Sequence, residues 1–290
     1  MKQVVWICWC WLSCITLGVQ AKKTDNREVV NLNREWTYQR GDYPGAEQAD
    51  YDDSGWEHVG LPHSFSIPYF MWKDFYTGYG WYRKTIVLDK ADLNREIFLE
   101  FDGVFQVAEV YMNGRLAATH KGGYTGFNVR LTPYMRKGEN QIAVRVDNSW
   151  RGDVAPRGGE HVFSGGIYRN MRLVKKNPVH IDWYGTFVTT PTLAAHKGRS
   201  SSVRVQTDVR NLTDQVGTYE LQIQVLDENR RVVSGQRAVR RVEAQSMARF
   251  DLSTDEIKGV ALWHPSHPHL YSVVHHRRKR SASLRYCDSV

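Results

Sequence analysis

Apolar and polar residues alternate with a period of two through most of this 290-residue chain, and this pattern constrains the fold more than any other feature. Ile142 and Val144 alternate with polar or small residues, and similar stretches begin at Tyr82, Val203 and Leu221. Strands of this kind bury one face and expose the other. No stretch of about 12 or more residues has a convincing helical period. The sequence therefore predicts an all-β protein.

Turn signals separate the predicted strands. Asn113-Gly114 lies between residues 104–112 and 115–120 and suits a type I′ hairpin, in which both central residues have positive φ angles. The segment TPYMRKG at residues 132–138 has a capping residue, a proline at the first helical position and a glycine at its end. It predicts a single helical turn.

A domain boundary is predicted near Asn177-Pro178. Residues 28–176 hold enough strands for a jelly-roll β-sandwich. Residues 178–274 hold six or seven strands, which is typical of an immunoglobulin-like β-sandwich. No Cys–Trp–Cys signature of an antibody-type domain is present. The predicted strands of the second domain are 179–190, 201–211, 217–227, 230–242, 247–252 and 269–274.

Residues 1–21 have the pattern of a signal peptide. Lys2 precedes an apolar run at residues 4–19, and the segment ends in small residues at Ala21, as secretory leaders do. A membrane anchor is the alternative, but the run is short for a span of about 20 residues. Cleavage after Ala21 predicts a periplasmic or extracellular protein. Cleavage before Cys14 would instead give a lipoprotein.

Cysteine usage and charge exclude two further classes of protein. Three of the four cysteines lie in the leader, so the mature chain keeps only Cys287 and no internal disulfide is predicted. Half of the net charge of +8 lies in residues 275–290, and the rest of the chain has no basic stripe. Nucleic acid is therefore not an expected partner.

Short motifs in a fixed order resemble the two N-terminal domains of glycoside hydrolase family 2, a galactose-binding-like jelly roll followed by an immunoglobulin-like domain. Any one of them is weak, whereas the ordered set is specific, and the resemblance covers residues 29–274. The motifs are DDSGW (52–56), LPH (61–63), GWYRK (80–84), FDGV (101–104), VYMNG (110–114), GENQIAV (138–144), SGGIYRN (164–170), WYGTFV (183–188) and LWHP (262–265).

The resemblance implies the hydrolysis of terminal glycosides with retention, and it favours a β-galactosidase over a glucuronidase or a mannosidase. In the family a TIM barrel follows the two sandwiches and carries two catalytic glutamates, about 5–5.5 Å apart. We expect this chain to lack that barrel domain and to contain no catalytic residue. No cofactor is expected. The expected partner is a galactoside-like carbohydrate, and the oligomeric state is not predicted.

The C-terminal residues break the alternating pattern. The strand at residues 269–274 should continue with alternating residues, but HHRRKRSAS follows at residues 275–283. We interpret residues 275–290 as an aberrant basic tail that arises from a shifted reading frame or a truncated gene, because the register is lost within a strand. A natural basic tail is the alternative.

The polar loop at residues 151–161 holds the candidate sugar-binding residues. The resemblance implies that Glu160, seven residues before Ile167, reaches into the sugar pocket, although the family usually has the shorter aspartate there. A carboxylate can accept two hydrogen bonds from adjacent sugar hydroxyls. A solvated loop carboxylate is the alternative. Asp153 is the second candidate sugar-binding residue, and for both Asp153 and Arg157 a surface charge or a contact to a neighbouring domain is the alternative.

Aromatic and histidine residues supply weaker candidates. Phe70, Trp72, Phe75 and Tyr76 either stack on a sugar or pack the edge of the sandwich. Five of the eleven histidines are candidate metal ligands but show no metal-ligand spacing, so no metal site is predicted; they are His63, His161, His264, His267 and His269. Two other functions remain open: a carbohydrate-binding protein that does not hydrolyse, and a cell-surface interaction protein.

Overall fold

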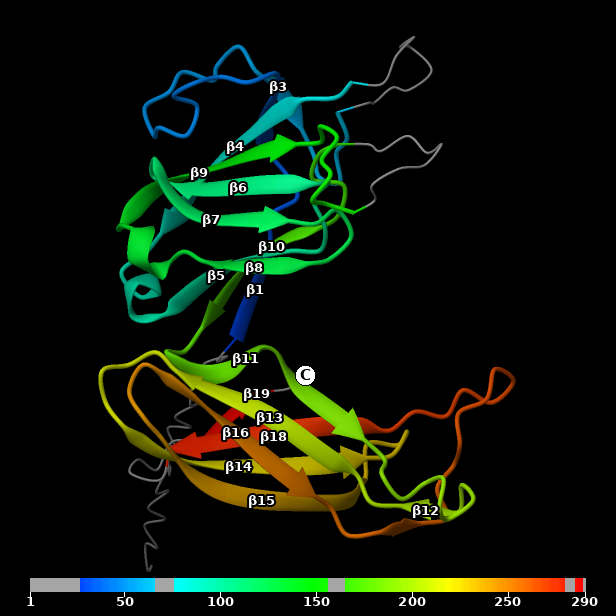
Figure 1. The fold of residues 1–290 in the computed structure, drawn as a ribbon. Coiled ribbons are helices and arrows are strands. Elements are labelled where there is room, and N and C mark those ends of the chain that lie inside the picture. The colour runs from blue at the N-terminus through cyan, green and yellow to red at the C-terminus, as the bar shows by residue number, and fades with distance from the viewer. Residues whose placement is uncertain (1–26, 66–75, 156–164, 280–284, 289–290) are drawn as a thin grey trace, which may run out of the picture.

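The computed structural model describes residues 27–65, 76–155, 165–279 and 285–288, and these residues are almost entirely β-structure (Figure 1). The described strands are interrupted by the short 3₁₀ helices η2 (Asp92–Asn94) and η3 (Thr132–Tyr134). Because η3 lies inside the TPYMRKG segment, the predicted single helical turn is confirmed. No helix within the described ranges is long and apolar enough to cross a membrane.

The first domain packs two antiparallel sheets face to face, with orders β3-β2-β4-β9-β6-β7 and β1-β10-β5-β8. Apolar side chains such as Leu99 and Val144 are buried between the sheets, as alternation predicts for a sandwich. The larger sheet contains β2 (Trp36–Arg40), β3 (Glu57–Val59), β4 (Tyr79–Leu88), β6 (Val107–Met112), β7 (Arg115–Lys121) and β9 (Gly138–Asp147). The smaller sheet contains β1 (Arg27–Asn31), β5 (Glu96–Phe101), β8 (Phe127–Arg130) and β10 (Met171–Lys176).

The Asn113-Gly114 turn connects β6 to β7 as the sequence predicts. Asn113 has φ 52° and Gly114 has φ 80°, so both central residues occupy the left-handed region that a type I′ turn requires. The Asn113 side chain also donates to the carbonyl oxygen of Tyr134 at 3.0 Å. The hairpin is thereby attached to the η3 turn.

Alternation fails at Arg83 on β4. The pattern places Arg83 on the exposed face, but the residue is only 1% exposed. Its Nε donates to Asp53 Oδ2 at 2.9 Å. Its remaining nitrogens donate to the carbonyl oxygens of Ala46, Gln48 and Tyr51. Residues 46–53 thus fold over the outer face of the sheet, and a buried guanidinium with this many acceptors is compensated.

The same outer face buries a second, smaller apolar core. Trp81 on β4 clusters there with Trp56. The DDSGW motif therefore supplies Asp53 and Trp56, and the GWYRK motif supplies their partners Arg83 and Trp81. In this chain the two motifs fasten the loop to the sheet, which is a structural role.

The second domain is an immunoglobulin-like sandwich of two main sheets, β11-β13-β16 and β15-β14-β18-β19, with a short pair β12-β17. Val205, Leu221 and Phe250 lie in its core. Its strands are β11 (Val179–Thr189), β12 (Ser200–Ser201), β13 (Arg204–Asn211), β14 (Gly217–Leu226), β15 (Val232–Val242), β16 (Ser246–Ser253), β17 (Ile257–Lys258), β18 (Ser272–Lys279) and β19 (Arg285–Asp288). Strands β11, β13, β14, β15 and β16 lie close to predicted stretches, whereas β18 begins and ends later than predicted and β17 and β19 were not predicted.

Strand β18 does not end at Val274. It pairs with β14 in unbroken register as far as Lys279, so the expectation that the register is lost at residue 275 is wrong. His275 is fully buried and Arg277 is 3% exposed. A β-ladder is made by backbone groups and tolerates polar side chains, and the Arg277 guanidinium lies 5.7 Å from the centre of the Tyr219 ring. The shifted reading frame remains a hypothesis about the gene.

The two sandwiches meet where β10 leads into β11 (Figure 1). The His180 ring packs edge-on against Phe98 of the first domain, with ring centres 5.6 Å apart. Trp183 packs against the core of the first domain as a half-buried side chain. Strand β11 therefore belongs to the second sheet while two of its side chains contact the first sandwich.

Candidate functional site

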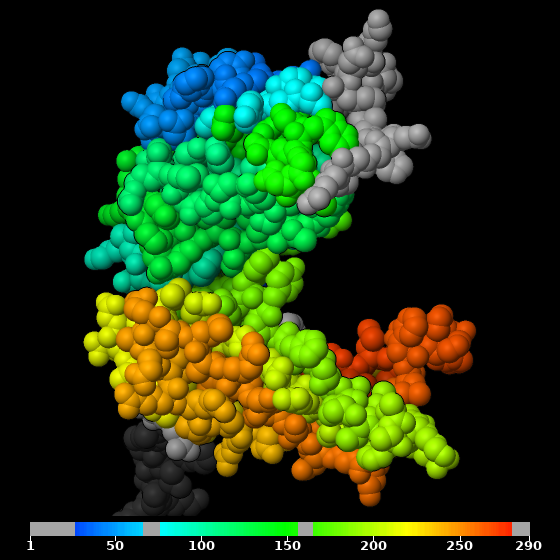
Figure 2. Space-filling view, in the orientation of Figure 1, coloured from blue at the N-terminus to red at the C-terminus, as the bar shows by residue number. Residues whose placement is uncertain are grey.

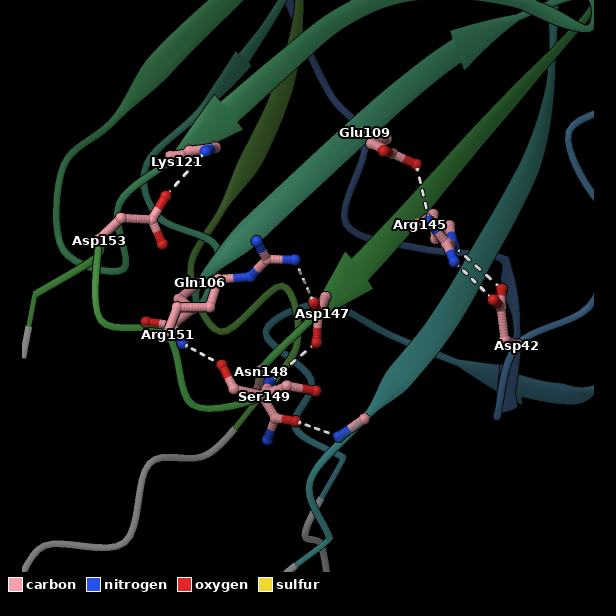
Figure 3. Close-up of polar contacts among 11 residues, drawn as sticks. Asp42, Gln106, Glu109, Lys121, Arg145, Asp147, Asn148, Ser149, Arg151 and Asp153 are labelled. Atoms are coloured by element: carbon pink, nitrogen blue, oxygen red, sulfur yellow. Dashed lines mark hydrogen bonds and ion pairs between the residues drawn. The ribbon is translucent and has the colours of Figure 1, made fainter. Parts of the chain in front are cut away.

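Four strand ends of the larger sheet in the first domain converge at one edge (Figure 3). Strands β4 and β6 begin there, and β9 and β7 end there. The segment that leaves β9 crosses this edge and carries Asp153. We call this region, residues 76–79, 106, 121 and 147–155, the loop edge. It contains the described part of the polar loop that the sequence singled out.

Buried polar side chains hold the loop edge together. Asn148 accepts a hydrogen bond from the Gly78 amide at 2.8 Å and donates to the carbonyl oxygen of Tyr76 at 3.0 Å. Gln106 Nε2 donates to the carbonyl oxygen of Ser149 at 2.6 Å. These bonds tie the segment after β9 to the starts of β4 and β6, so its first residues are held by the sheet.

Asp147 is a buried carboxylate that orders the same segment. It accepts from the Ser149 amide at 2.8 Å and from Arg151 at 2.9 Å. Burial raises the pKa of Asp147, but the hydrogen bonds from Ser149 and the Arg151 guanidinium outweigh burial and leave the pKa below its usual range. Asp147 is therefore ionised at neutral pH and has a structural role.

Asp153, one of the two predicted sugar-binding residues, is exposed at the loop edge. Its carboxylate accepts a hydrogen bond from Lys121 Nζ at 2.9 Å, and both side chains are open to solvent. The Lys121 ammonium lowers the pKa of Asp153. Asp153 thus presents an ionised acceptor beside a cation, which suits a ligand with hydroxyl groups.

Several predicted candidates lie outside the described residues: Glu160, Arg157, His161, Phe70, Trp72 and Phe75. Tyr76 is described. It packs partly buried against the first core and donates to the carbonyl oxygen of Tyr79 at 2.8 Å. For this residue the packing alternative applies.

Trp150 is an exposed aromatic residue at the loop edge that the sequence analysis missed. It lies two residues after Asn148, between the buried anchors and Asp153. An exposed indole can stack on a sugar ring, and a carboxylate such as that of Asp153, three residues later, can accept hydrogen bonds from sugar hydroxyls. Its position directly after the end of a predicted strand could have revealed it.

The described histidines do not form a metal site. His63 is largely buried and its Nδ1 lies 2.8 Å from the Tyr82 hydroxyl. Burial, together with the nearby Arg40 cation, lowers the pKa of His63 to about 4, so the ring is neutral. His264 and His267 form a tight exposed turn. No group of three or more metal-ligating side chains occurs in the part of the chain that the structure describes.

Beside the loop edge, Arg145 bridges two carboxylates on the outer face of the larger sheet (Figure 3). It donates to Asp42 at 2.5 and 2.9 Å and to Glu109 at 3.2 Å. The guanidinium also lies 4.0 Å from the centre of the Tyr79 ring. These contacts engage the guanidinium on three sides, which is consistent with bracing between strands.

Two family models match consecutive parts of the chain. The model described as "Glycosyl hydrolases family 2, sugar binding domain" matches residues 29–177, and the model "Glycosyl hydrolases family 2" matches residues 179–279. This chain belongs to glycosyl hydrolase family 2. The second match of this family 2 chain includes residues 275–279, in agreement with the continuation of β18.

Similar proteins are longer glycosidases. A β-galactosidase of Thermoanaerobacter pseudethanolicus is 32% identical over 85% of this chain and 33% of its own length. The β-galactosidase BoGH2A of Bacteroides ovatus is 32% identical over 86% of this chain and 29% of its own length. The crystal structure of a Bacteroides uniformis β-glucuronidase superposes with a TM-score of 0.85 at 28% identity, covering 90% of this chain and 32% of that one. The family 2 chain therefore spans about a third of the length of these relatives.

Proposed function

We propose that this chain is the non-catalytic N-terminal part of a secreted family 2 glycosidase, most consistent with a β-galactosidase that acts in carbohydrate breakdown. The supporting observation is that both domains match family 2 in the usual order, while relatives named β-galactosidase extend to about three times this length. The catalytic glutamates that the resemblance implies belong to a barrel domain.

In this proposal the loop edge contributes part of the wall of a sugar site. Asp153 and Glu160 accept hydrogen bonds from sugar hydroxyls, and Trp150 offers an aromatic face. The buried anchors Asp147 and Asn148 support this role because they hold the preceding backbone in place. A site built on anchored backbone loses less entropy when it binds a ligand.

Turnover of a chromogenic β-galactoside by the purified chain tests the proposal. We expect no hydrolysis above that of a mock preparation from cells lacking the gene. A longer protein that joins these domains to a barrel from a similar β-galactosidase should hydrolyse the substrate. Clear turnover by the chain alone, at a rate proportional to its concentration, would contradict a non-catalytic role.

A stand-alone carbohydrate-binding protein is the second candidate, and the exposed Asp153 and Trp150 favour it. Calorimetric titration of the chain with galactose separates the two. Binding that is lost in Asp153→Asn would support a self-sufficient binding module. Absence of binding, together with activity once a barrel is joined, would support the glycosidase part.

Secretion is proposed from the leader alone. Expression in a bacterium followed by mass spectrometry of the exported chain should show a mature N-terminus at Lys22. A lipid-modified N-terminus at Cys14 would identify a lipoprotein. A chain that keeps Met1 and stays in the cytoplasm would contradict secretion.

A further inference from the structure

A cleft lies between the two sandwiches, on the side of β11 that faces the first domain. Its volume is about 430 Å³, within the range of about 300–1,000 Å³ typical of small-molecule sites, which favour domain interfaces. Figure 2 shows the surface hollowed between the two domains beside the yellow-green residues of β11. The lining includes residues 100–102 and 172 of the first domain and residues 180–186 of the second.

An unusually large bulge in β11 places two aromatic residues at this cleft. Ile181 pairs with Val209 and Thr186 pairs with Thr207, so the four residues 182–185 stand opposite one residue of β13. Tyr184 lies within the bulge with φ 50°, a left-handed conformation that non-glycine residues rarely adopt. Bulges and such strained residues re-aim side chains and cluster at functional sites.

The bulge leaves an aromatic surface that the fold buries only in part. Tyr184 is 83% exposed, and its ring centre lies 4.4 Å from that of Trp183. Burial of a tyrosine normally stabilises a fold, so packing gives no reason to strain the backbone in order to expose this one. Two adjacent rings with one open face suit the apolar face of a sugar ring.

The charged side chains that line the cleft are balanced: Arg27, Arg172 and Lys176 stand against Glu100, Asp102 and Asp182. Lys176 Nζ lies 4.0 Å from Glu100 Oε1. Arg172 donates to both carboxylate oxygens of Asp102 at 2.7 Å, and Arg27 lies 3.6 Å from Glu100. Asp182 is paired with Arg210 of β13. Because cations and carboxylates are balanced, a strongly charged ligand gains little, whereas a neutral polyol can exchange hydrogen bonds with both kinds of group.

Residues in the wall also hold polar atoms without hydrogen-bond partners in the described chain: His180 Nε2, Thr186 Oγ1 and Glu100 Oε1. His180 is 5% exposed, and its Nδ1 donates to the carbonyl oxygen of Asn177 at 2.8 Å. Burial lowers the pKa of His180 to about 4, so Nε2 is an unprotonated acceptor. A hydroxyl donor, directly or through a bridging water, would satisfy such acceptors.

From this combination we propose that the interdomain cleft binds a neutral saccharide unit, stacked on the Tyr184 and Trp183 rings and hydrogen-bonded to the paired side chains of the wall. This site uses no residue of the loop edge. The two proposals are therefore tested by different variants. A uronic acid should bind no more tightly than its neutral counterpart, because the wall carries no excess of cations.

Calorimetric titration of the mature chain with methyl β-galactoside, methyl β-glucoside, lactose and cellobiose tests the proposal, with glucuronate as the charged comparison. Tyr184→Ala should weaken binding of the preferred sugar about tenfold, as expected for loss of one stacked ring. Tyr184→Phe should retain the affinity, since the ring remains. Tyr124→Ala is the matched control, because Tyr124 is 58% exposed elsewhere on the first domain.

The Asp153→Asn variant distinguishes sugar binding in the cleft from sugar binding at the loop edge. Binding that survives Asp153→Asn and is lost in Tyr184→Ala, with the melting temperature unchanged, would assign the sugar to the cleft. Binding that depends on Asp153 and ignores Tyr184 would overturn the assignment. So would no binding of any neutral sugar at its highest soluble concentration, or clear preference for glucuronate.

Discussion

Two buried ionisable side chains, one in each sandwich, are accommodated in different ways. In the first domain Arg83 is buried with the Asp53 carboxylate and three backbone carbonyls around it. In the second domain His275 is fully buried on β18, and its Nε2 lies 3.2 Å from Thr207, while Nδ1 has no hydrogen-bond partner among the described residues. Partners compensate the buried charge of Arg83, whereas burial keeps the His275 imidazole neutral, as it does the His63 ring of the first domain. Burial of a polar group is therefore tolerated by two distinct routes.

The largest expected effect on stability comes from removing the buried Arg83 guanidinium. Arg83→Met removes the guanidinium that donates to Asp53 and to three carbonyl oxygens, and should lower the free energy of unfolding of the first domain by about 3 kcal/mol. Calorimetry of the mature chain should show the unfolding transition of the first domain shifted to lower temperature. Arg249→Met is the control, because Arg249 is exposed and paired with Asp208, and an exposed pair contributes about 0–1 kcal/mol. Equal effects of the two variants would contradict the comparison.

Lowering the pH should destabilise both sandwiches, because each buries a histidine that is neutral in the folded state. Burial lowers the pKa values of His63 and His275 to about 4, from an ordinary value near 6.5. The unfolded chain then binds more protons below pH 6.5, so stability is full above that pH and falls as the pH drops towards 4. At pH 5 the loss is about 2 kcal/mol for each ring. Urea unfolding at pH 7 and pH 5 measures it, and unchanged midpoints would contradict it.

The buried His275 ring can also be removed together with its partner, the Thr207 hydroxyl. The double variant His275→Val with Thr207→Val replaces a buried polar pair by apolar groups, and it should stabilise the second sandwich by about 1 kcal/mol at pH 7. The single variant His275→Val should be less stable than the double, because it leaves the Thr207 hydroxyl unpartnered. The double variant should also lose the acid sensitivity of the second transition. A double variant less stable than the native chain would show that His275 is better accommodated than we infer.

The smallest effect concerns the loop edge. Asp153→Asn removes an exposed ion pair with Lys121 and should change the free energy of unfolding by less than about 0.5 kcal/mol. Its effect on sugar binding, if the loop edge binds sugar, should be larger than its effect on stability. A strong loss of stability in thermal unfolding would instead give Asp153 a structural role.

Local signals were enough to predict much of this fold. Asn113-Gly114 specified its hairpin because only the turn geometry was at issue. The burial of Arg83 was not predictable, because it depends on a loop 30 residues earlier in the chain folding over the sheet. The β18 boundary was missed because His275 and Arg277 hide the alternation from a pattern of apolar residues. In each case the missing information is a tertiary contact.

The candidate sites, like the fold, could be predicted from the sequence only in part. The loop after β9 was predicted to be polar and exposed, and Asp153 is found there. Its partner Lys121 comes from the end of β7, which no local rule connects to it. The WYGTFV segment reads as ordinary strand, since a bulge that sets four residues opposite one is visible only when β13 is in place. Tyr184 was therefore not a candidate from sequence.

The pairing of β1 with β10 has a consequence for synthesis. Arg27 pairs with Lys176 and Asn31 with Arg172. The first strand of the sandwich therefore pairs with its last strand and cannot join the sheet until that strand has been made. While the ribosome is still making the intervening residues, the start of the chain has no place in the sheet. The sheet that contains β1 therefore cannot be completed until the chain has been made as far as Lys176.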